Sequence, residues 1–340
     1  MAINKRLIKS NEGGVAVPAS FNTVLYVGNR PSSNNVGGVG FQPDLVWIKD
    51  RDASDFHSLL DSVRGSFVLS SNSTNAESTF PFTFTDDGFV VPNSGQANTN
   101  GNNYVAWCWK AGGAAVTNTD GVTSGSVTAV TSEVSANVDA GFSIAKFTSP
   151  ASGKPSWGHG LNASPDFIIV KRFDGSQNWY IYLPSVLGQK ELTFTTAAAT
   201  TYPQFLSVDS SKIDLGSASF NISSNADYIS YCFHSVAGFS KIGSYTGNGG
   251  TNTITIGFEP AFIMFKKTSG DNWMIIDNKR DTKTVKNLGL FPNLPLEELN
   301  PNFGVNGVEF LGNGFTITTG DGTVNASGGT YIYMAFANEF

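Results

Sequence analysis

The chain is poor in charge, in histidine and in cysteine. Charged residues make up 14% of its 340 residues, below the roughly 25% of typical soluble proteins. The net charge is −6, and nucleic-acid affinity comes largely from clustered Lys and Arg, so we expect no nucleic-acid partner. The sequence has 3 histidines, and they do not cluster. Because a metal site needs about three or four converging ligands, we expect no metal and no cofactor.

Long apolar segments are also missing. No run approaches the roughly 18 apolar residues that span a bilayer, so we expect no membrane insertion. The first residues carry two early cations, but only Leu7 and Ile8 follow them as an apolar pair, which is too short for the apolar core of a signal peptide. We therefore expect a protein that is made in a cytoplasm and leaves it, if at all, without the Sec route.

Catalytic motifs are absent as well. The sequence contains no G-x-S-x-G, no phosphate-binding G-x-x-x-x-G-K-[ST] and no C-x-x-C. Acid pairs occur at Asp50/Asp52, Asp86-Asp87 and Glu297-Glu298. A glycosidase needs two carboxyl groups that converge across a cleft, whereas adjacent residues on a strand or turn point apart. We therefore assign no catalytic residue and expect a protein that is not an enzyme.

What the sequence does contain is one pattern that occurs three times. Each copy has a short β-branched and aromatic segment after a proline (45–49, 167–171 and 262–266) and a closing segment of alternating bulky residues (104–109, 228–233 and 331–336). Asn-Gly and Asp-Gly turns separate such segments, and helical periodicity is almost absent. We predict an all-β protein of three tandem homologous antiparallel β-sandwich modules, jelly-roll-like in character.

The repeats set the expected domain boundaries. The modules cover residues 21–110, 141–237 and 238–340, because Gly141-Phe142-Ser143 recurs as Gly238-Phe239-Ser240. Residues 1–20 form an N-terminal docking arm. Residues 111–140 lack aromatic side chains and are rich in small residues. Their Val-x-x-x-Val spacings allow a loose hairpin, and the composition is equally typical of a linker or an exposed arm, which is the assignment we make. The expected helices are short, at 56–63 and 296–299.

Several residues have both a structural and a functional interpretation. Trp157 lies at a position that varies between repeats, so it is the candidate for ligand contact. Trp179 and Trp273 match each other and Phe56, which favours a recurring core position. Cys108 and Cys232 occupy the place of Ala335, which indicates a small buried slot and no disulfide. Two further sets, listed here, have structural interpretations: His57, His159 and His234 as structural residues, and Asp61/Arg64 and Asp277/Arg280 as structural ion pairs that each fix a loop and that would contribute little stability if exposed.

Four segments give the chain a recognisable resemblance. Residues 1–9 (MAINKRLIK), 41–49 (FQPDLVWIK), 104–113 (YVAWCWKAGG) and 328–337 (GGTYIYMAFA) resemble an uncharacterised repeat protein of marine tailed bacteriophages, notably those of cyanobacteria and related ocean bacteria. The resemblance covers essentially the whole chain. It implies a virion structural protein, either a tail fibre or a capsid-surface protein, and it supplies no catalytic residues.

The expected function follows from both lines of reasoning. We expect a structural protein that is assembled in the host cytoplasm, displayed on the virion surface, tail-fibre-like and in contact with the host, with loops available for a host-surface glycan. The alternatives are a capsid decoration protein without a ligand and a polysaccharide depolymerase. We expect a homo-oligomer that contacts other virion proteins through Ile3, Lys5, Arg6, Leu7 and Ile8 of the docking arm.

Overall fold

The computed structural model describes residues 19–201, 206–215, 222–298 and 307–338. The described part is nearly all β-structure, and its sheets are antiparallel except for one parallel pair, β11 (Val127–Ala129) with β14 (Lys154–Gly158). The prediction of an all-β protein with antiparallel sheets is therefore confirmed. The helices found in this part are single turns, α1 (Gly95–Asn98) and α2 (Pro184–Leu187).

Three sets of strands share one sheet order. We call strands β1–β9 the first group, β10–β21 the second and β22–β29 the third. Each group contains one sheet, which we call its inner sheet, with four strands in the same order. The closing strand of the sequence pattern is the second of the four. The orders are β1 (Phe21–Val27), β9 (Asn103–Trp109), β3 (Leu45–Asp50), β4 (Ser58–Asp61); then β13 (Phe142–Thr148), β21 (Asp227–Phe233), β15 (Phe167–Arg172), β16 (Tyr180–Tyr182); then β22 (Ser240–Thr246), β29 (Thr330–Ala337), β24 (Pro260–Lys267), β25 (Trp273–Asp277).

Each inner sheet is covered on one side by an outer sheet. The outer sheets are β2 (Asn34–Val36), β8 (Gly88–Val91), β7 (Thr83–Thr85); β11, β14, β20 (Lys212–Leu215), β19 (Leu206–Val208); and β23 (Asn252–Thr255), β28 (Gly314–Ile317), β27 (Val308–Leu311), β26 (Val285–Lys286). The second inner sheet is extended by β10 (Val116–Asn118), β12 (Ser132–Asn137), β17 (Lys190–Thr193) and β18 (Thr200–Thr201), and β5 (Phe67–Val68) pairs with β6 (Ser78–Thr79). The division into modules at the residues given above stays a prediction.

The alternation predicted for the closing strands separates two kinds of core. On β9, Tyr104, Ala106 and Cys108 face the outer sheet of the first group, and Trp107 and Trp109 face the opposite way. The same division holds on β21 and β29, so each group has its own inter-sheet core. Both faces of β9, β21 and β29 are buried, as expected for central strands.

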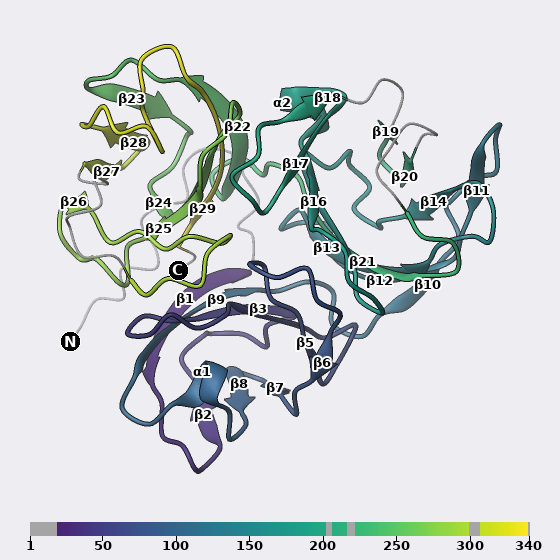
Figure 1. The fold of residues 1–340 in the computed structure, drawn as a ribbon, viewed down its shortest axis with the longest axis horizontal. Coiled ribbons are helices and arrows are strands. Elements are labelled where there is room, and N and C mark those ends of the chain that lie inside the picture. Colours follow the sequence, from purple (N-terminus) through teal and green to yellow (C-terminus); the bar gives the residue numbers. More distant parts are fainter. Residues whose placement is uncertain (1–18, 202–205, 216–221, 299–306, 339–340) are drawn as a thin grey trace, which may run out of the picture.

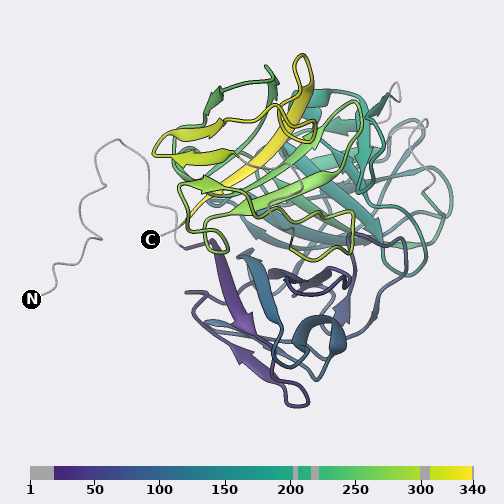
Figure 2. The ribbon, with the colours of Figure 1, turned by 60° about the vertical axis from the view of Figure 1, so that its left-hand side comes forward.

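The other faces of the three inner sheets meet in one central core. Trp107 and Trp109 from the first group, Phe233 from the second, and Phe262 and Phe336 from the third belong to the same buried cluster. Trp109 lies edge-on to Phe262, Phe233 and Phe336, with centroids 5.7, 6.3 and 5.8 Å away. Figure 1 shows the three groups arranged around this shared centre, and Figure 2 shows them from a second direction.

The turns before β8 and β28 illustrate why the pattern requires glycine. A Cβ atom on Gly88 would lie 2.0 Å from the carbonyl oxygen of Val36, and one on Gly314 would lie 2.1 Å from that of Ile254. Only glycine allows the backbone to approach so closely. The matching Asp87-Gly88 and Asn313-Gly314 dipeptides therefore serve backbone geometry, as expected from the sequence.

Four local predictions were wrong. Residues 111–140 are not a linker or an exposed arm, because they form β10, β11 and β12, which join the sheets of the second group. Residues 58–61 form strand β4, and none of the described residues 296–298 is helical. The side chain of Phe56 is exposed, and continuing the register of β3 with β4 by one residue places the buried His57 at the position of Trp179 and Trp273.

Candidate functional site

Trp157 is not available for ligand contact. Its side chain is fully buried in the core of the second group, where it stacks on Phe147 at a centroid distance of 4.4 Å. The indole Nε1 donates to Ser230 Oγ over 3.1 Å. With its ring fully buried and its N–H group engaged inside the protein, this tryptophan offers no platform for a sugar, and the sequence-based candidate is corrected on this point.

The residues proposed for docking lie elsewhere. Ile3, Lys5, Arg6, Leu7 and Ile8 fall outside the described residues. Their assignment as an arm that contacts other virion proteins stays a prediction.

The aromatic and histidine positions at the start of the fourth inner strand connect each group to the next. Trp179 donates to the carbonyl oxygen of Ser70 over 2.9 Å, and Trp273 donates to that of Thr193 over 2.7 Å. His57 closes the ring of contacts, with its Nε2 3.0 Å from the carbonyl oxygen of Phe291. The second group thus contacts the first, the third contacts the second, and the first contacts the third.

The protonation of His57 is fixed by its neighbours. Trp47 Nε1 donates to His57 Nδ1 over 2.9 Å, so the proton of the neutral ring lies on Nε2 and is donated to Phe291. Burial, together with the positive charge of Lys49, lowers the pKa of His57 to about 3. The histidine is therefore a neutral structural link, as the sequence interpretation held.

A buried lysine accompanies each of these positions. Lys49, Lys171 and Lys266 occupy matching places, and burial lowers the pKa of each to about 8. Lys171 Nζ donates across the groups to the carbonyl oxygen of Thr74 over 3.0 Å, and Lys266 Nζ donates likewise to Thr195 over 3.1 Å. Lys171 and Lys266 thus satisfy carbonyl oxygens at boundaries between groups, whereas Lys49 Nζ donates to the carbonyl oxygens of Asp50 and Ala53 within the first group.

The two acid–base pairs are structural ion pairs, as interpreted from the sequence, but they are buried and lie between groups. Arg64 Nε lies 2.6 Å from Asp61 Oδ2, and both side chains are at most 1% exposed. Tyr231 of the second group donates its hydroxyl to the same Asp61 oxygen over 2.8 Å. Burial of the phenol and the nearby Asp61 charge raise the pKa of Tyr231 well above its ordinary value, which keeps it a donor.

The second pair repeats this arrangement between the third and first groups. Arg280 Nε lies 2.6 Å from Asp277 Oδ2, which also accepts a hydrogen bond from Trp107 Nε1 over 3.0 Å. Glu298 Oε1 lies 2.7 Å from Arg280 Nη1, and its Oε2 lies 2.7 Å from Arg51 Nη2 of the first group. Both pairs therefore hold neighbouring groups together.

The third boundary has an apolar version of the same triad. By strand register, Leu183 stands where the other groups have Asp61 and Asp277, and Met334 stands where they have Trp107 and Tyr231. Val186 follows Leu183 at the spacing that separates Arg64 from Asp61. Leu183 and Met334 belong to the central core, and Val186 packs against it. The acid, the arginine and the hydrogen-bond donor are thus either all present at a boundary or all replaced by apolar residues.

The adjacent acids singled out from the sequence are also engaged locally. Asp87 accepts from the backbone N–H groups of Gly38 and Gly40, and these bonds lower its pKa. Asp50 accepts from the backbone of Asp52 and Ala53. In the described ranges no group of three or more His, Cys, Asp or Glu side chains is placed to hold a metal ion. Within the same ranges, no helix has the length and apolarity to cross a membrane.

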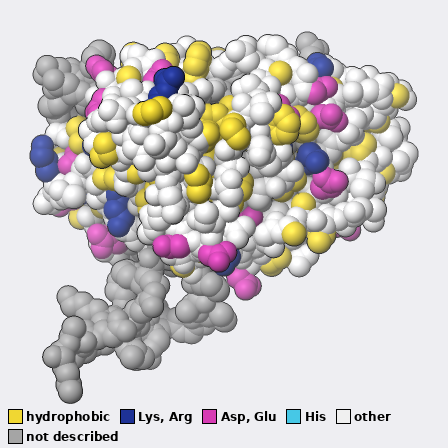
Figure 3. All heavy atoms as spheres, turned by 90° about the horizontal axis from the view of Figure 1, so that it is seen from below, with side chains coloured by type: hydrophobic (Ala, Val, Ile, Leu, Met, Phe, Trp, Pro, Cys, Tyr) yellow, Lys and Arg dark blue, Asp and Glu magenta, His cyan; other side chains and the backbone are white. Residues whose placement is uncertain are grey.

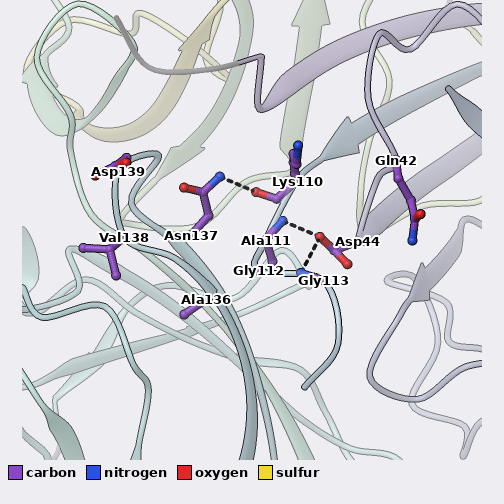
Figure 4. A pocket seen from close by; sticks show the side chains of 10 residues that line it. All are labelled: Gln42, Asp44, Lys110, Ala111, Gly112, Gly113, Ala136, Asn137, Val138 and Asp139. Atoms are coloured by element: carbon purple, nitrogen blue, oxygen red, sulfur yellow. Dashed lines mark hydrogen bonds between the residues drawn. The ribbon is translucent and has the colours of Figure 1, made fainter. Parts of the chain in front are cut away.

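One surface hollow, of about 550 Å³, lies at the seam of the first and second groups (Figure 4). Asp44 faces it but is buried, and its Oδ2 accepts from the backbone N–H groups of Ala111 and Gly113 over 2.8 and 3.3 Å. Asn137 donates to the carbonyl oxygen of Lys110 over 3.3 Å. The polar groups that Figure 4 shows here join the two groups, so this hollow has a structural explanation.

A second hollow, of about 520 Å³, combines aromatic and charged side chains, and we call it the β5–β13 groove. Its lining includes Phe67 and Glu77 of the first group and Glu133, Lys146, Phe173 and Asp227 of the second. Phe67 is 37% exposed. The groove is the candidate functional site, because it places side chains from two groups around an open volume of the size that ligand pockets have.

The charges of the groove are paired within it. Lys146 Nζ lies 2.6 Å from Glu133 Oε2, and Arg64 Nη1 lies 3.1 Å from Glu77 Oε2. Asp227 Oδ1 accepts from Thr148 Oγ1 over 2.6 Å. Burial raises the pKa of Glu77, against the opposing effect of the Arg64 guanidinium. The groove thus holds ion pairs and hydrogen-bond acceptors beside the phenyl rings of Phe67 and Phe173, and the buried Phe147 also borders it.

Sequence reasoning missed the groove because its walls come from distant segments. One signal was present on β13: Lys146 and Thr148 continue the alternating face that carries Phe142 and Ile144. By register, Lys146 matches Leu25 of β1. A polar residue on a face that is otherwise apolar marks the point where that face leaves the core.

One family model matches the chain. It is described as a domain of unknown function, DUF7483, and it matches residues 18–339. No curated protein matches the sequence.

Proposed function

This chain belongs to the DUF7483 family, whose description assigns no activity, and we propose from its own residues that it is a structural protein of a virion. In this proposal it is displayed on the particle surface, is tail-fibre-like and contacts the host. The resemblance of its repeats to a protein of marine tailed bacteriophages supports the proposal.

The observation that carries the proposal is the position of the buried charged side chains, which lie between the groups of strands. Asp61, Arg64, Asp277 and Arg280 are buried between groups, where they fix one group against the next. The face in Figure 3 carries charged side chains scattered among hydrophobic ones, and most of it is neither charged nor hydrophobic side chain. A protein whose charged groups join its own parts, and whose surface is polar but sparsely charged, is suited to a rigid building block.

The two alternatives differ in what the surface does. A capsid decoration protein would need no ligand site, and the β5–β13 groove argues against this alternative. A depolymerase would need two carboxyl groups across a cleft. Glu77 and Asp227 do line the groove from two groups, but Glu77 is paired with Arg64 and Asp227 with Thr148. We therefore keep the proposal of a binding protein without catalysis.

The test is to ask whether the chain is part of a particle. Phage particles that encode it are purified on a density gradient, their proteins are quantified by mass spectrometry, and antibodies against the folded chain are added to intact particles. We expect many copies per particle and antibody binding to the intact surface. Absence of the chain from purified particles, or antibody binding only after disruption, would refute the proposal.

A further inference from the structure

The β5–β13 groove has a chemical character that points to one class of ligand. Phe67 and Phe173 contribute phenyl rings to the lining, and Phe67 lies on a strand of only two residues at the edge of the first group. An exposed aromatic ring on a surface strand contributes little to the core. Aromatic rings within a concave surface are, however, the usual apolar component of ligand pockets.

The charge balance of the groove excludes an anionic ligand. Three acids (Glu77, Glu133 and Asp227) and two cations (Arg64 and Lys146) line it, so its formal charge is −1. Both cations are held by acids, Arg64 by Asp61 and Glu77 and Lys146 by Glu133. A phosphate, a sulfate or a uronate would therefore meet no unpaired positive charge and a surplus of negative charge.

The acceptor groups fit a ligand that donates hydrogen bonds without carrying charge. Carboxylates accept through two oxygens, each with more than one lone pair, so Glu133 and Asp227 have acceptor positions beyond those used by Lys146 and Thr148. Sugar hydroxyls can donate to these positions. The C–H face of a pyranose ring is apolar and can stack on a phenyl ring, whose face carries the negative part of its quadrupole.

We propose that the β5–β13 groove binds a neutral oligosaccharide segment, with Phe67 and Phe173 stacking on its rings and Glu133 and Asp227 accepting from its hydroxyls. This inference rests on the proposed function, in which the surface contacts a host, and it names the ligand class of that contact. An apolar peptide fits less well, because it would remove the ion pairs of the groove from water without satisfying their remaining hydrogen bonds.

Binding at one groove is expected to be weak, because the lining is open to solvent. Several copies on one particle raise the effective concentration of sites without any new contact, so weak single sites suffice for attachment. The isolated chain should therefore show fast exchange with its ligand, and a multivalent display should bind much more tightly.

The experiment uses the full chain and a panel of neutral oligosaccharides, namely gluco-, manno-, xylo- and galacto-oligomers, together with the neutral fraction of the host envelope polysaccharide. Binding is measured by saturation-transfer NMR and calorimetry. Dextran sulfate and an apolar peptide serve as anionic and peptide probes. We expect at least one neutral member to bind and neither of the other probes to compete.

Two matched variants locate the site. Phe67→Ala removes an exposed ring of the groove, and Phe56→Ala removes an exposed ring of the same group that lies at a different hollow. We expect Phe67→Ala to weaken binding by about ten-fold or more and Phe56→Ala to change it by less than about two-fold, with unchanged melting curves. Asp227→Asn, which keeps the shape of the side chain, should weaken binding several-fold.

Several outcomes would overturn the inference. They are an absence of binding to every neutral member of the panel, equal effects of Phe67→Ala and Phe56→Ala, or preferential binding of dextran sulfate or of the peptide. Sustained release of reducing ends, lost in Glu77→Gln, would replace binding with hydrolysis. None of these results affects the detection of the chain in purified particles, so a failure of the groove is distinguishable from a failure of the proposed function.

Discussion

Replacing Asp61 tests whether the buried triads hold the groups together. Asp61 accepts from Arg64 Nε, from the backbone of Val63 and Arg64, and from the Tyr231 hydroxyl, all within 3.1 Å. Asp61→Leu leaves the Arg64 guanidinium buried with one fewer anion. Removing one partner of a buried pair typically costs about 3–5 kcal/mol, and we expect a loss of unfolding free energy in this range.

The apolar boundary shows how the loss can be reversed. Asp61→Leu/Arg64→Val/Tyr231→Met reproduces the Leu183, Val186 and Met334 set at the boundary between the first and second groups. Replacing a whole buried ionic set by apolar residues is often neutral or stabilising. We expect the triple variant to be more stable than Asp61→Leu by about 2 kcal/mol or more, although it carries two additional changes that are each destabilising alone.

Urea denaturation followed by tryptophan fluorescence measures these free energies. Asp174→Leu is the control, because its pair with Arg172 is partly exposed and should contribute at most about 1 kcal/mol. If Asp61→Leu were no more destabilising than the control, the pair would not stabilise the fold. The triple variant could instead be less stable than Asp61→Leu by the summed costs of Arg64→Val and Tyr231→Met. In that case the Leu183, Val186 and Met334 set would not be the apolar equivalent of the triad.

Three further predictions concern the same contacts. Trp107→Ala should destabilise the protein by about 3–5 kcal/mol in urea, since Trp107 is fully buried and donates to Asp277; an unchanged midpoint would contradict this. The folded pKa of His57, about 3, is below its unfolded value of 6.5, so its contribution to stability should be lost as pH falls through this window; melting curves of wild type and His57→Gln should therefore converge on acidification, and a constant difference would refute the claim. The folded pKa of Lys266, about 8, is below its unfolded value of 10.5, so the stability of wild type relative to Lys266→Met should rise between these pH values, and a fall would contradict the buried ammonium.

The sequence was sufficient to predict the closing strands and their two faces. On β9 the alternation of Tyr104, Ala106 and Cys108 with Trp107 and Trp109 separated the two cores correctly. Successive side chains of a strand point to opposite faces, so a segment with bulky apolar residues on both faces can be recognised as a central strand from its own residues. Cys108 and Cys232 are both free and buried, as their repeat positions indicated.

The sequence did not show what covers the inner face. An apolar position predicts burial but does not name its partner, so the meeting of the three inner sheets could not be deduced. The burial of Asp61 and Arg64 was missed because charged residues are usually exposed. A clue was present in the replacement of this acid by Leu183 in the second group, since leucine is among the residues most often found fully buried.

The match of Phe56 with Trp179 failed by one residue. A single-residue slip moves every side chain of a strand to the other face, so the exposed Phe56 was placed where His57 belongs. The groove could not be predicted from the sequence for a different reason. Phe67 and Lys146 come from separate groups, and only the folded arrangement brings them to one hollow.

Differential scanning calorimetry tests most directly whether the three groups form one structure around a shared core. Unfolding any one group would expose the inner faces of the other two, including Trp109 and Phe336, to water. We predict a single transition for the full chain, with the calorimetric enthalpy close to the van't Hoff enthalpy, and a shift of that whole transition in Trp107→Ala. Two or three separate transitions, with only one of them shifted by Trp107→Ala, would contradict the account.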